Sequence, residues 1–371
     1  MMRSVSKGLF KQPDKIANNC FDTRATSMSF NEIKVIKRKI DDEDPPEPKT
    51  PEIHCHGHTL NFTESKNKDK KRTPKIIAFG GGKGGIGKSF LSGNISFALA
   101  KSGLNVSLID LDIGAANLHT CLGVNSPKNS IVDFINNKVD DIETLGVPGG
   151  ISGLTLYAGG QEFWQQIKLN TSEKTRLISK LQSINSDFVI LDLGAGTHTN
   201  TLDFFVFSHG GVIVVVPEPT SIENAYVFMK SVLFRKVQSV LKAIDKEGRS
   251  KELLASLSNP KNTEPPLTQL HNFQKKHPKL GDSLLKILKA TRVGIIMNQT
   301  RTQSDIELGF SMSQVCERFF GLTAEFLGAT NFDDTVWRSI RVRRPVFMDF
   351  PSSQISHSIN KLAEKMYHTF R

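Results

Sequence analysis

Short apolar runs alternate with longer amphipathic stretches from residue 75 to the end of the chain. We predict β-strands in seven of these runs: Lys75–Phe79, Val106–Asp110, Leu154–Tyr157, Phe188–Asp192, Val212–Val216, Val293–Met297 and Glu325–Leu327. Continuous apolar runs of this length are typical of strands that are buried on both faces. Strands that alternate with helices predict an α/β fold, in which helices cover both faces of a parallel, mostly seven-stranded sheet.

Two helical stretches carry clear apolar stripes. Between the first two strands the stripe consists of Leu91, Ile95, Ala98 and Leu99, and it stops at Gly103, a suitable C-terminal cap. At the end of the chain it consists of Ile355, Ile359, Leu362, Ala363, Met366 and Phe370. The second stripe has two open interpretations, a helix packed on the sheet or a helix on a membrane surface, and we favour the first.

The chain divides into an arm and a domain. Residues 1–73 mix both charges with prolines, include the acidic segment Asp41–Pro51, and end in the basic run Lys66–Arg72. Such a composition buries too little apolar area to offset the entropy of ordering, so we predict a disordered arm. Residues 74–371 form the predicted domain, with a helical insertion at about 235–290 around a proline-rich centre.

Charge and cysteine content narrow the class of protein. The formal net charge is +11, which favours anionic partners such as nucleic acid, acidic lipid or an acidic protein surface. Basic residues gather in Lys66–Arg72 and in a second group, Arg338, Arg341, Arg343 and Arg344, and each group has a solvated surface as its alternative. The four cysteines are scattered, no apolar run is long enough to span a bilayer, and residues 1–4 start no secretory signal, so we expect a cytoplasmic protein without an integral membrane segment.

The strongest chemical signal follows the first strand. Gly82-Lys83-Gly84-Gly85-Ile86-Gly87-Lys88-Ser89 matches G-x-x-x-x-G-K-[ST] and lies between a strand and an amphipathic helix. Its glycines allow backbone N–H groups to approach phosphates closely, and the helix that follows directs the positive end of its dipole at them. Lys88 is placed to contact the β and γ phosphates, and the Ser89 hydroxyl to contact Mg²⁺. We therefore predict a P-loop NTPase.

Three carboxylates follow strands behind this loop. Asp110 ends the second predicted strand, Asp112 follows it, and Asp192 ends the fourth. An aspartate at the carboxyl end of a parallel strand lies at the edge of the sheet where ligands bind. Each one alone is also explained as a turn cap, but three in this order favour a site that holds Mg²⁺ and orients water.

The segment Lys83-Gly84-Gly85-Ile86-Gly87-Lys88-Ser89 resembles the deviant Walker A motif of the MinD/ParA ATPases. This resemblance covers roughly residues 75–350 and implies that the extra lysine, Lys83, acts in trans on the nucleotide of the other subunit in an ATP-bound dimer. Asp110-Leu111-Asp112-Ile113-Gly114 is similar to switch I of that family, which implies that Asp112 positions the attacking water. Asp110 and Asp192 are then in the Mg²⁺ shell, through waters.

Two further matches are less complete. Asp192 to Gly196 resembles the Walker B and switch II segment, with Gly194 where that family commonly has proline. Asn298 matches the asparagine that reads adenine in the family, although capping of a turn is an open alternative. The expected cofactors are ATP and Mg²⁺.

Within this family the chain looks most like the flagellar-number regulators FlhG/FleN, on Asp110–Leu122 and Leu327–Val346. The resemblance implies a slow ATPase that forms a homodimer with ATP, has a regulatory protein partner, and governs the placement or number of a flagellum or division site, at the inner membrane or cell pole. The alternative is a ParA-like segregation ATPase whose ATP dimer binds DNA nonspecifically. An iron–sulfur carrier of the same fold needs cysteine pairs that this sequence lacks.

Overall fold

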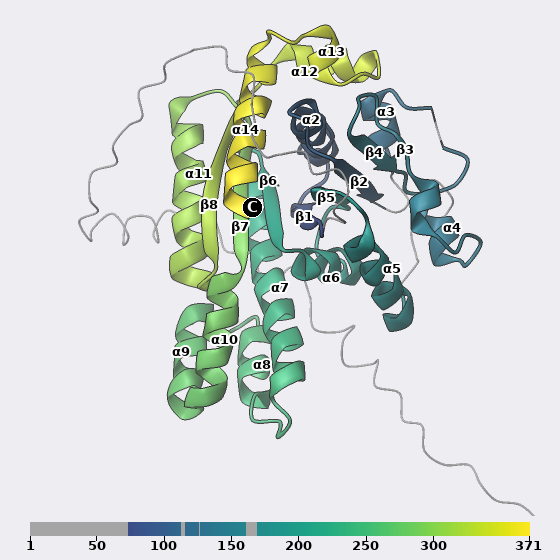
Figure 1. Cartoon of the computed structure of the whole chain (residues 1–371). Helices are drawn as coiled ribbons and strands as arrows, with labels where there is room; N and C mark the ends of the chain where they lie inside the picture. The colour runs from purple at the N-terminus through teal and green to yellow at the C-terminus, as the bar shows by residue number, and fades with distance from the viewer. Residues whose placement is uncertain (1–72, 113–115, 126, 161–168) are drawn as a thin grey trace, which may run out of the picture.

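The computed structural model describes residues 73–112, 116–125, 127–160 and 169–371 (Figure 1). The predicted arm therefore lies outside the described residues, apart from Thr73. Part of the predicted switch I segment, residues 113–115, lies outside them too.

One eight-stranded sheet forms the centre of the fold, in the order β3-β4-β2-β5-β1-β6-β7-β8. The strands are β1 (Lys75–Gly80), β2 (Val106–Leu111), β3 (Val147–Pro148), β4 (Leu154–Tyr157), β5 (Phe188–Leu193), β6 (Gly210–Val215), β7 (Arg292–Thr300) and β8 (Thr323–Asn331). All pair in parallel except β3, which is antiparallel to β4 at one edge. The α/β fold with a mostly parallel sheet, predicted from the sequence, is confirmed.

The seven predicted strands all exist, and the missed eighth is β3. It has only two residues, one of them Pro148, so no apolar run marks it. In β1 alternate residues enter separate cores, with Ile76 and Ala78 on one face and Ile77 and Phe79 on the other. A strand packed on both faces is apolar throughout, which explains why these runs could be recognised.

Helices cover both faces of the sheet. One face carries α2 (Lys88–Lys101), α3 (Leu118–Leu122), α13 (Val346–Asp349) and α14 (Gln354–Phe370). The other carries α4 (Ile131–Ile135), α5 (Thr171–Ser183), α6 (Thr199–Phe207), α7 (Pro219–Ile244) and α11 (Gln303–Val315), with a 3₁₀ turn at Ile142–Leu145 and a π turn at Cys316–Phe320.

The apolar stripe of α14 is buried. Ile359, Ala363 and Met366 have no exposed surface, and Ile355, Leu362 and Phe370 are nearly as buried. The helix packs against α2 and β8. The interpretation as a core helix is therefore correct for this stripe. No helix among the described residues is both long and apolar enough to cross a bilayer.

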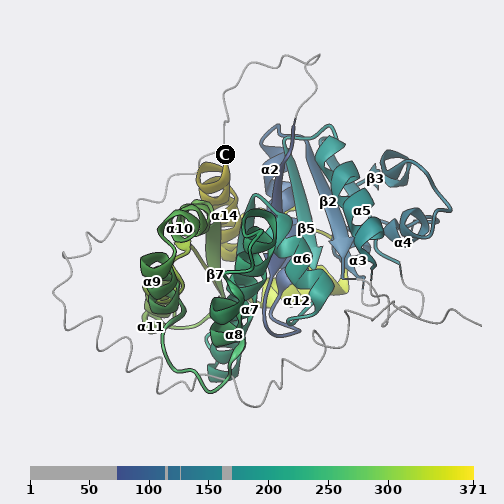
Figure 2. The same cartoon turned by 90° about the horizontal axis from the view of Figure 1, so that it is seen from below.

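Three helices separate α7 from β7: α8 (Lys251–Ser258), α9 (Pro266–Lys276) and α10 (Pro278–Ala290). Figures 1 and 2 show them grouped beside one end of α7, away from α3 and α4. The last of them leads into the amino end of β7. Helix α12 (Asp334–Arg341) follows the carboxyl end of β8 and lies with α13 at the opposite end of the molecule (Figure 1).

Candidate functional site

The P-loop lies at the carboxyl end of β1, between that strand and α2. Strand β1 is central, with β5 on one side and β6 on the other. In open α/β sheets ligands bind at the carboxyl ends of the strands. The structure therefore places the predicted phosphate loop at the edge where a nucleotide is expected.

Close packing explains two of the loop glycines. A Cβ on Gly82 would lie 2.1 Å from the carbonyl oxygen of Asn224, and one on Gly87 would lie 2.3 Å from Nδ2 of Asn298. Gly87 also has φ 88°, in the left-handed region that favours glycine. Because these two residues lack a side chain, the loop backbone packs closely against Asn224 and Asn298. A phosphate cradle likewise requires a backbone that can be approached closely.

Helix α2 starts directly at Lys88, which is only 6% exposed. The N-cap Gly87 supplies no side chain, so the first N–H groups of α2 are left for another acceptor. Twelve of the fourteen residues of α2 are buried between the sheet and α14, which fixes this helix end in place. A rigid helix terminus with a buried lysine is suited to holding an anion.

Asp192 is a buried carboxylate with no partner. Both of its oxygens lack a hydrogen bond from any described residue, and the residue is 1% exposed. Burial raises the pKa of Asp192 to about 6, although the nearby Ser89 hydroxyl and Lys88 ammonium act in the opposite direction. A buried, unpaired carboxylate is costly unless something else, such as a cation, occupies the site.

Asp110 lies beside Asp192 on the neighbouring strand, because the two are register partners in β2 and β5. Its Oδ1 accepts the N–H of Asp112 at 3.1 Å, and its Oδ2 accepts the N–H of Leu118 at 3.2 Å. Burial, followed by the charge of Asp192, raises the pKa of Asp110 well above its usual value. Asp110 thus anchors the switch I backbone and the start of α3.

Asp112 faces the segment that follows β5. A Cβ on Gly194 would lie 2.8 Å from Oδ1 of Asp112, so this glycine leaves room for the carboxylate. Burial raises the pKa of Asp112, and the charge of Lys88 opposes that rise. In addition, the N–H of Gly196 donates to the carbonyl of Gly81 at 3.0 Å, which ties the segment after β5 to the P-loop.

These residues fit a nucleotide with Mg²⁺. The charge of Lys88 lowers the pKa of both Asp112 and Asp192, and neither oxygen of Asp192 accepts a hydrogen bond from a described residue. No group of three ligating side chains occurs in the described part of the chain. Magnesium usually keeps several waters and binds one or two carboxylates together with phosphates, so such a group is not required. Ser89 and Asp192 are the side chains best placed to hold it.

The Lys83 side chain contacts the segment that follows β6. Its Nζ donates to Oε2 of Glu218 at 2.8 Å and to the hydroxyl of Thr220 at 3.4 Å. Both acceptors follow the carboxyl end of β6, next to β1. The Lys83 and Glu218 side chains are 40% and 58% exposed. Sequence analysis missed Glu218, although its position just after a strand beside the P-loop was a usable signal.

Asn298 braces the P-loop. Its Nδ2 donates to the carbonyl of Ile86 at 2.8 Å, while its Oδ1 accepts the hydroxyl of Thr330 at 2.5 Å and the N–H of Gln299 at 3.0 Å. One N–H of the amide remains for a base. Reading of adenine by Asn298 stays a prediction. Thr330, the buried threonine that orients this amide, was not identified from the sequence.

We predict that Thr330→Val weakens nucleotide binding about 3- to 10-fold, because losing a buried hydrogen bond costs about 1–2 kcal/mol and frees the Asn298 side chain. Isothermal titration with ADP measures this effect. Thr330→Ser retains the hydroxyl and is the matched control. Equal affinities in the wild type and Thr330→Val would show that Asn298 is held in place without Thr330.

The comparisons with known proteins agree with this geometry. A ParA family model, described as NUBPL iron-transfer P-loop NTPase, matches residues 72–244. The chain is 26% identical to the antiactivator FleN of Pseudomonas aeruginosa over 297 residues, which cover 79% of this chain and 86% of FleN. It is 35% identical to the flagellum site-determining protein YlxH of Helicobacter pylori, over 44% of this chain and 55% of YlxH.

Among solved structures, MinD of Pyrococcus horikoshii complexed with Mg-ADP superimposes with a TM-score of 0.55 at 20% identity, covering 79% of this chain and 96% of MinD. The chain is similar to the ParA/MinD P-loop NTPases, and it shares their fold. These similarities support the prediction of a P-loop ATPase that uses ATP and Mg²⁺. The residue roles within the site stay predictions.

Iron transfer, which appears in the description of the ParA family model, finds no support in the described cysteines. Cys316 is buried against Sδ of Met229, and burial raises the pKa of its thiol far above the usual value. Burial also raises the pKa of Cys121 to about 11. A metal ligand must be a thiolate, so both thiols are poor ligands. Cys20 and Cys55 lie outside the described residues.

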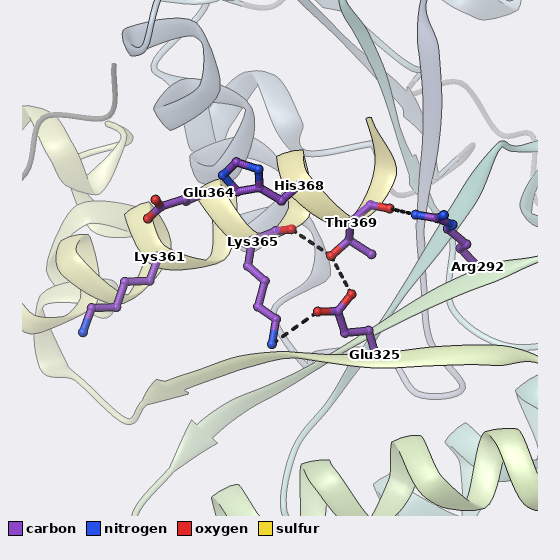
Figure 3. A pocket seen from close by; sticks show the side chains of 7 residues that line it. All are labelled: Arg292, Glu325, Lys361, Glu364, Lys365, His368 and Thr369. Carbon is purple, nitrogen blue, oxygen red and sulfur yellow. Dashed lines mark hydrogen bonds and ion pairs between the residues drawn. The ribbon is translucent and has the colours of Figure 1, made fainter. Parts of the chain in front are cut away.

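The hollow in Figure 3 is not the nucleotide site. Its volume is about 490 Å³, and it lies between α14 and the amino ends of β7 and β8, away from the P-loop edge. Its polar groups also satisfy one another. Arg292 donates to the carbonyl of Thr369 at 2.6 Å, the Thr369 hydroxyl donates to Glu325, and Lys365 lies 3.5 Å from the same carboxylate (Figure 3). These contacts dock α14 on the sheet.

Proposed function

We propose that this protein is an ATP-dependent dimerisation switch that hydrolyses ATP slowly with Mg²⁺. The observation that carries the proposal is Lys83, a second lysine in the P-loop, which is half exposed and turned toward Glu218. A lysine that is exposed and held only by a surface ion pair is available to a second molecule. In this proposal Lys83 contacts the nucleotide of the other subunit, Lys88 contacts its own, and Asp112 positions the attacking water.

The cellular role that we propose is control of the placement or number of a flagellum or division site. The similarity to FleN, named an antiactivator, extends over 86% of that protein, and YlxH and several matched relatives are named as flagellum or septum site-determining proteins. The chain spans only about half the length of YlxH and of MinD from Thermotoga maritima. A regulatory protein partner, and a cytoplasmic or peripheral membrane location, belong to the same proposal.

We predict that light scattering shows a monomer without nucleotide or with ADP, and a dimer with ATP and Mg²⁺. Asp112→Ala is expected to prolong the life of the dimer, because the variant lacks the group that positions the water. The matched control is Asp282→Ala, an exposed carboxylate in α10 among the inserted helices, which should behave like the wild type. If the chain binds ATP and stays a monomer, the switch is excluded. DNA binding that appears only with ATP and weakens with salt would favour the ParA-like alternative.

A further inference from the structure

Helices α12 and α13 carry most of the exposed apolar surface of the described chain. Six large hydrophobic side chains are exposed among the described residues, and four of them belong to this segment: Trp337, Ile340, Val342 and Met348. Trp337 is the most exposed, at 61%. A group of this kind is unusual on a monomer and typically marks a binding surface. We call these four residues and the arginines among them the α12–α13 patch.

The patch is also strongly basic. Its arginines are Arg338, Arg341, Arg343 and Arg344, all exposed. Arg344 pairs with Asp349 at 2.9 Å, and the guanidinium of Arg341 lies 5.1 Å from the centre of the Trp337 ring. Arg338 lies close enough to Asp333 to lower the pKa of that carboxyl. No carboxylate forms an ion pair with Arg341 or Arg343 within the described ranges, so the patch is suited to an anionic occupant.

The α12–α13 patch is anchored to the rest of the fold by contacts on its buried side. The carbonyl of Arg343 packs against Gly123, and the backbone N–H of Val346 donates to Oδ1 of Asn94 in α2 at 2.9 Å. Phe347 is buried and stacks on Phe97 with ring centres 5.8 Å apart. The segment is therefore anchored, and its apolar side chains are exposed by a packed backbone. Presenting an exposed tryptophan on a fixed scaffold is how proteins anchor partners.

We propose that the α12–α13 patch binds the chain's own acidic, proline-rich segment, residues 41–48. The segment reads Asp41-Asp42-Glu43-Asp44-Pro45-Pro46-Glu47-Pro48 and carries five carboxylates and no basic residue. Its carboxylates match the unpaired arginines in sign, and arginine binds carboxylates in a two-pronged geometry. The segment is the only run of this composition in the sequence.

The prolines of the acidic segment are suited to packing on the exposed Trp337 ring. Pro45 and Pro48 are three residues apart, which is the repeat of the polyproline II helix, so both rings face the same side in that conformation. Extended proline-rich segments bind to exposed aromatic rings at a low entropic cost. Trp337, with Arg341 against its ring, offers such an aromatic surface beside positive charge.

The chain is long enough for this contact. Twenty-four residues lie between Pro48 and Thr73, the first described residue. Fully extended they reach roughly 80 Å, whereas a domain of this size has a radius of gyration of roughly 20 Å. A linker of this kind gives an effective concentration on the order of millimolar, so even a weak contact is well populated.

The other occupants fit less well. A symmetric contact between two copies of the patch would place like-charged arginines against each other, which is unfavourable. An anionic bilayer matches the arginines and Trp337, but α12 has only eight residues, which is short for a helix that lies in a membrane surface. The experiment tests both.

Tryptophan fluorescence tests the proposal in the full-length chain. Trp164 is the only other tryptophan, so Trp164→Phe leaves Trp337 as the reporter. Acrylamide is an uncharged quencher, so a change in charge does not alter its local concentration. Converting Asp41, Asp42, Glu43 and Asp44 to their amides is expected to raise the quenching of Trp337 about twofold or more, because the ion pairs that hold the segment are lost.

Three further measurements make the result specific. The matched control converts the same number of carboxylates elsewhere in residues 1–72 to amides, namely Glu32, Glu52, Glu64 and Asp69, and should leave quenching unchanged. Salt at roughly 1 M, where the Debye length is about 3 Å, should expose Trp337 in the unaltered segment. Pro45→Ala with Pro48→Ala should raise quenching while all charges remain.

Equal quenching with the acidic and the neutral segment would overturn the proposal. Protection that disappears on dilution would assign the patch to a second copy instead. A blue shift of Trp337 emission on addition of phosphatidylglycerol vesicles, with the segment intact, would assign it to a membrane. Since none of these measurements uses nucleotide, failure here is distinguishable from failure of the ATP switch.

Discussion

Asp192→Asn is expected to stabilise the nucleotide-free chain and to abolish Mg²⁺-dependent hydrolysis. The carboxylate is buried, and neither oxygen accepts a hydrogen bond, although the hydroxyls of Ser89 and Ser92 lie near enough to lower its pKa. Its pKa of about 6 lies about 2 units above that of an unfolded aspartate, which corresponds to about 3 kcal/mol at neutral pH. Because the asparagine is also left without partners, we expect a gain of about 1–2 kcal/mol in the free energy of unfolding.

The pH dependence of stability tests independently whether the Asp192 carboxylate destabilises the fold. Between pH 4 and pH 6 the folded chain keeps a proton on Asp192 that the unfolded chain has released, so the stability of the wild type should fall as pH rises through this window. Asp192→Asn removes this titration, and its stability should vary less over the same range. Mg²⁺ requires the ionised carboxylate, so stabilisation by Mg²⁺ with nucleotide should weaken below about pH 6 in the wild type.

Urea unfolding at several pH values, with and without Mg²⁺ and ADP, measures these effects. Asp203→Asn is the matched control, because that carboxylate is paired with Lys174 and Arg235, both at 2.6 Å. It should lose stability where Asp192→Asn gains it. A loss of stability in Asp192→Asn without nucleotide would mean that the carboxylate has a partner in solution, and would remove the argument for a cation at this position.

The sequence was sufficient to predict the layers of the fold and the main part of the site. Strands that are buried on both faces consist of continuous apolar runs, and β5 ends in Asp192 and a glycine, so both the strand and its ligand edge could be recognised. The P-loop was recognisable because its glycines are needed by the backbone, as the close approach of Gly82 to Asn224 shows.

Pairwise contacts between distant segments were not predictable. Thr330 holds Asn298 across two strand ends, and Glu218 reaches Lys83 from a position 135 residues away. The position of Glu218 after a strand placed it near the P-loop, but nothing in the sequence identified Lys83 as its partner or Thr330 as the partner of Asn298. Strand β3 was missed because its two residues are held by pairing with β4, and not by their own apolar character. The periodicity of apolar residues indicates which positions are buried. The contacts named here depend instead on which distant segments the fold brings together.

The contact between Lys83 and Glu218 has a strength suited to a switch. Exposed ion pairs contribute about 0.2–1 kcal/mol, and the side chains here are 40% and 58% exposed. Such a pair orients Lys83 in the nucleotide-free chain. It is too weak to prevent Lys83 from binding an anion of higher charge. A triphosphate carries several negative charges, so in the proposed dimer it outcompetes a single carboxylate. Loss of Glu218 should therefore change the dimerisation equilibrium and the stability of the fold by no more than about 1 kcal/mol each.

We predict opposite effects from the two members of this pair. Lys83→Gln should retain ATP binding, because Lys88 and the glycine cradle are intact, but should lose both the dimer and at least about 100-fold in hydrolysis rate, as on removal of a charge donated in trans. Glu218→Gln should shift the ATP-dependent monomer–dimer equilibrium toward the dimer by up to about 5-fold, the equivalent of about 1 kcal/mol. Light scattering with ATP and phosphate release measure the two effects.

The double variant Lys83→Gln with Glu218→Gln separates the two explanations for a Glu218 effect. If Glu218 acts only by holding Lys83, the double variant should behave like Lys83→Gln alone, because the lysine that it restrains is absent. If the double variant recovers the dimer, Glu218 instead repels the second subunit by its own charge. A Lys83→Gln chain that dimerises and hydrolyses like the wild type would exclude the trans role of Lys83, and the protein would then act on ATP as a monomer.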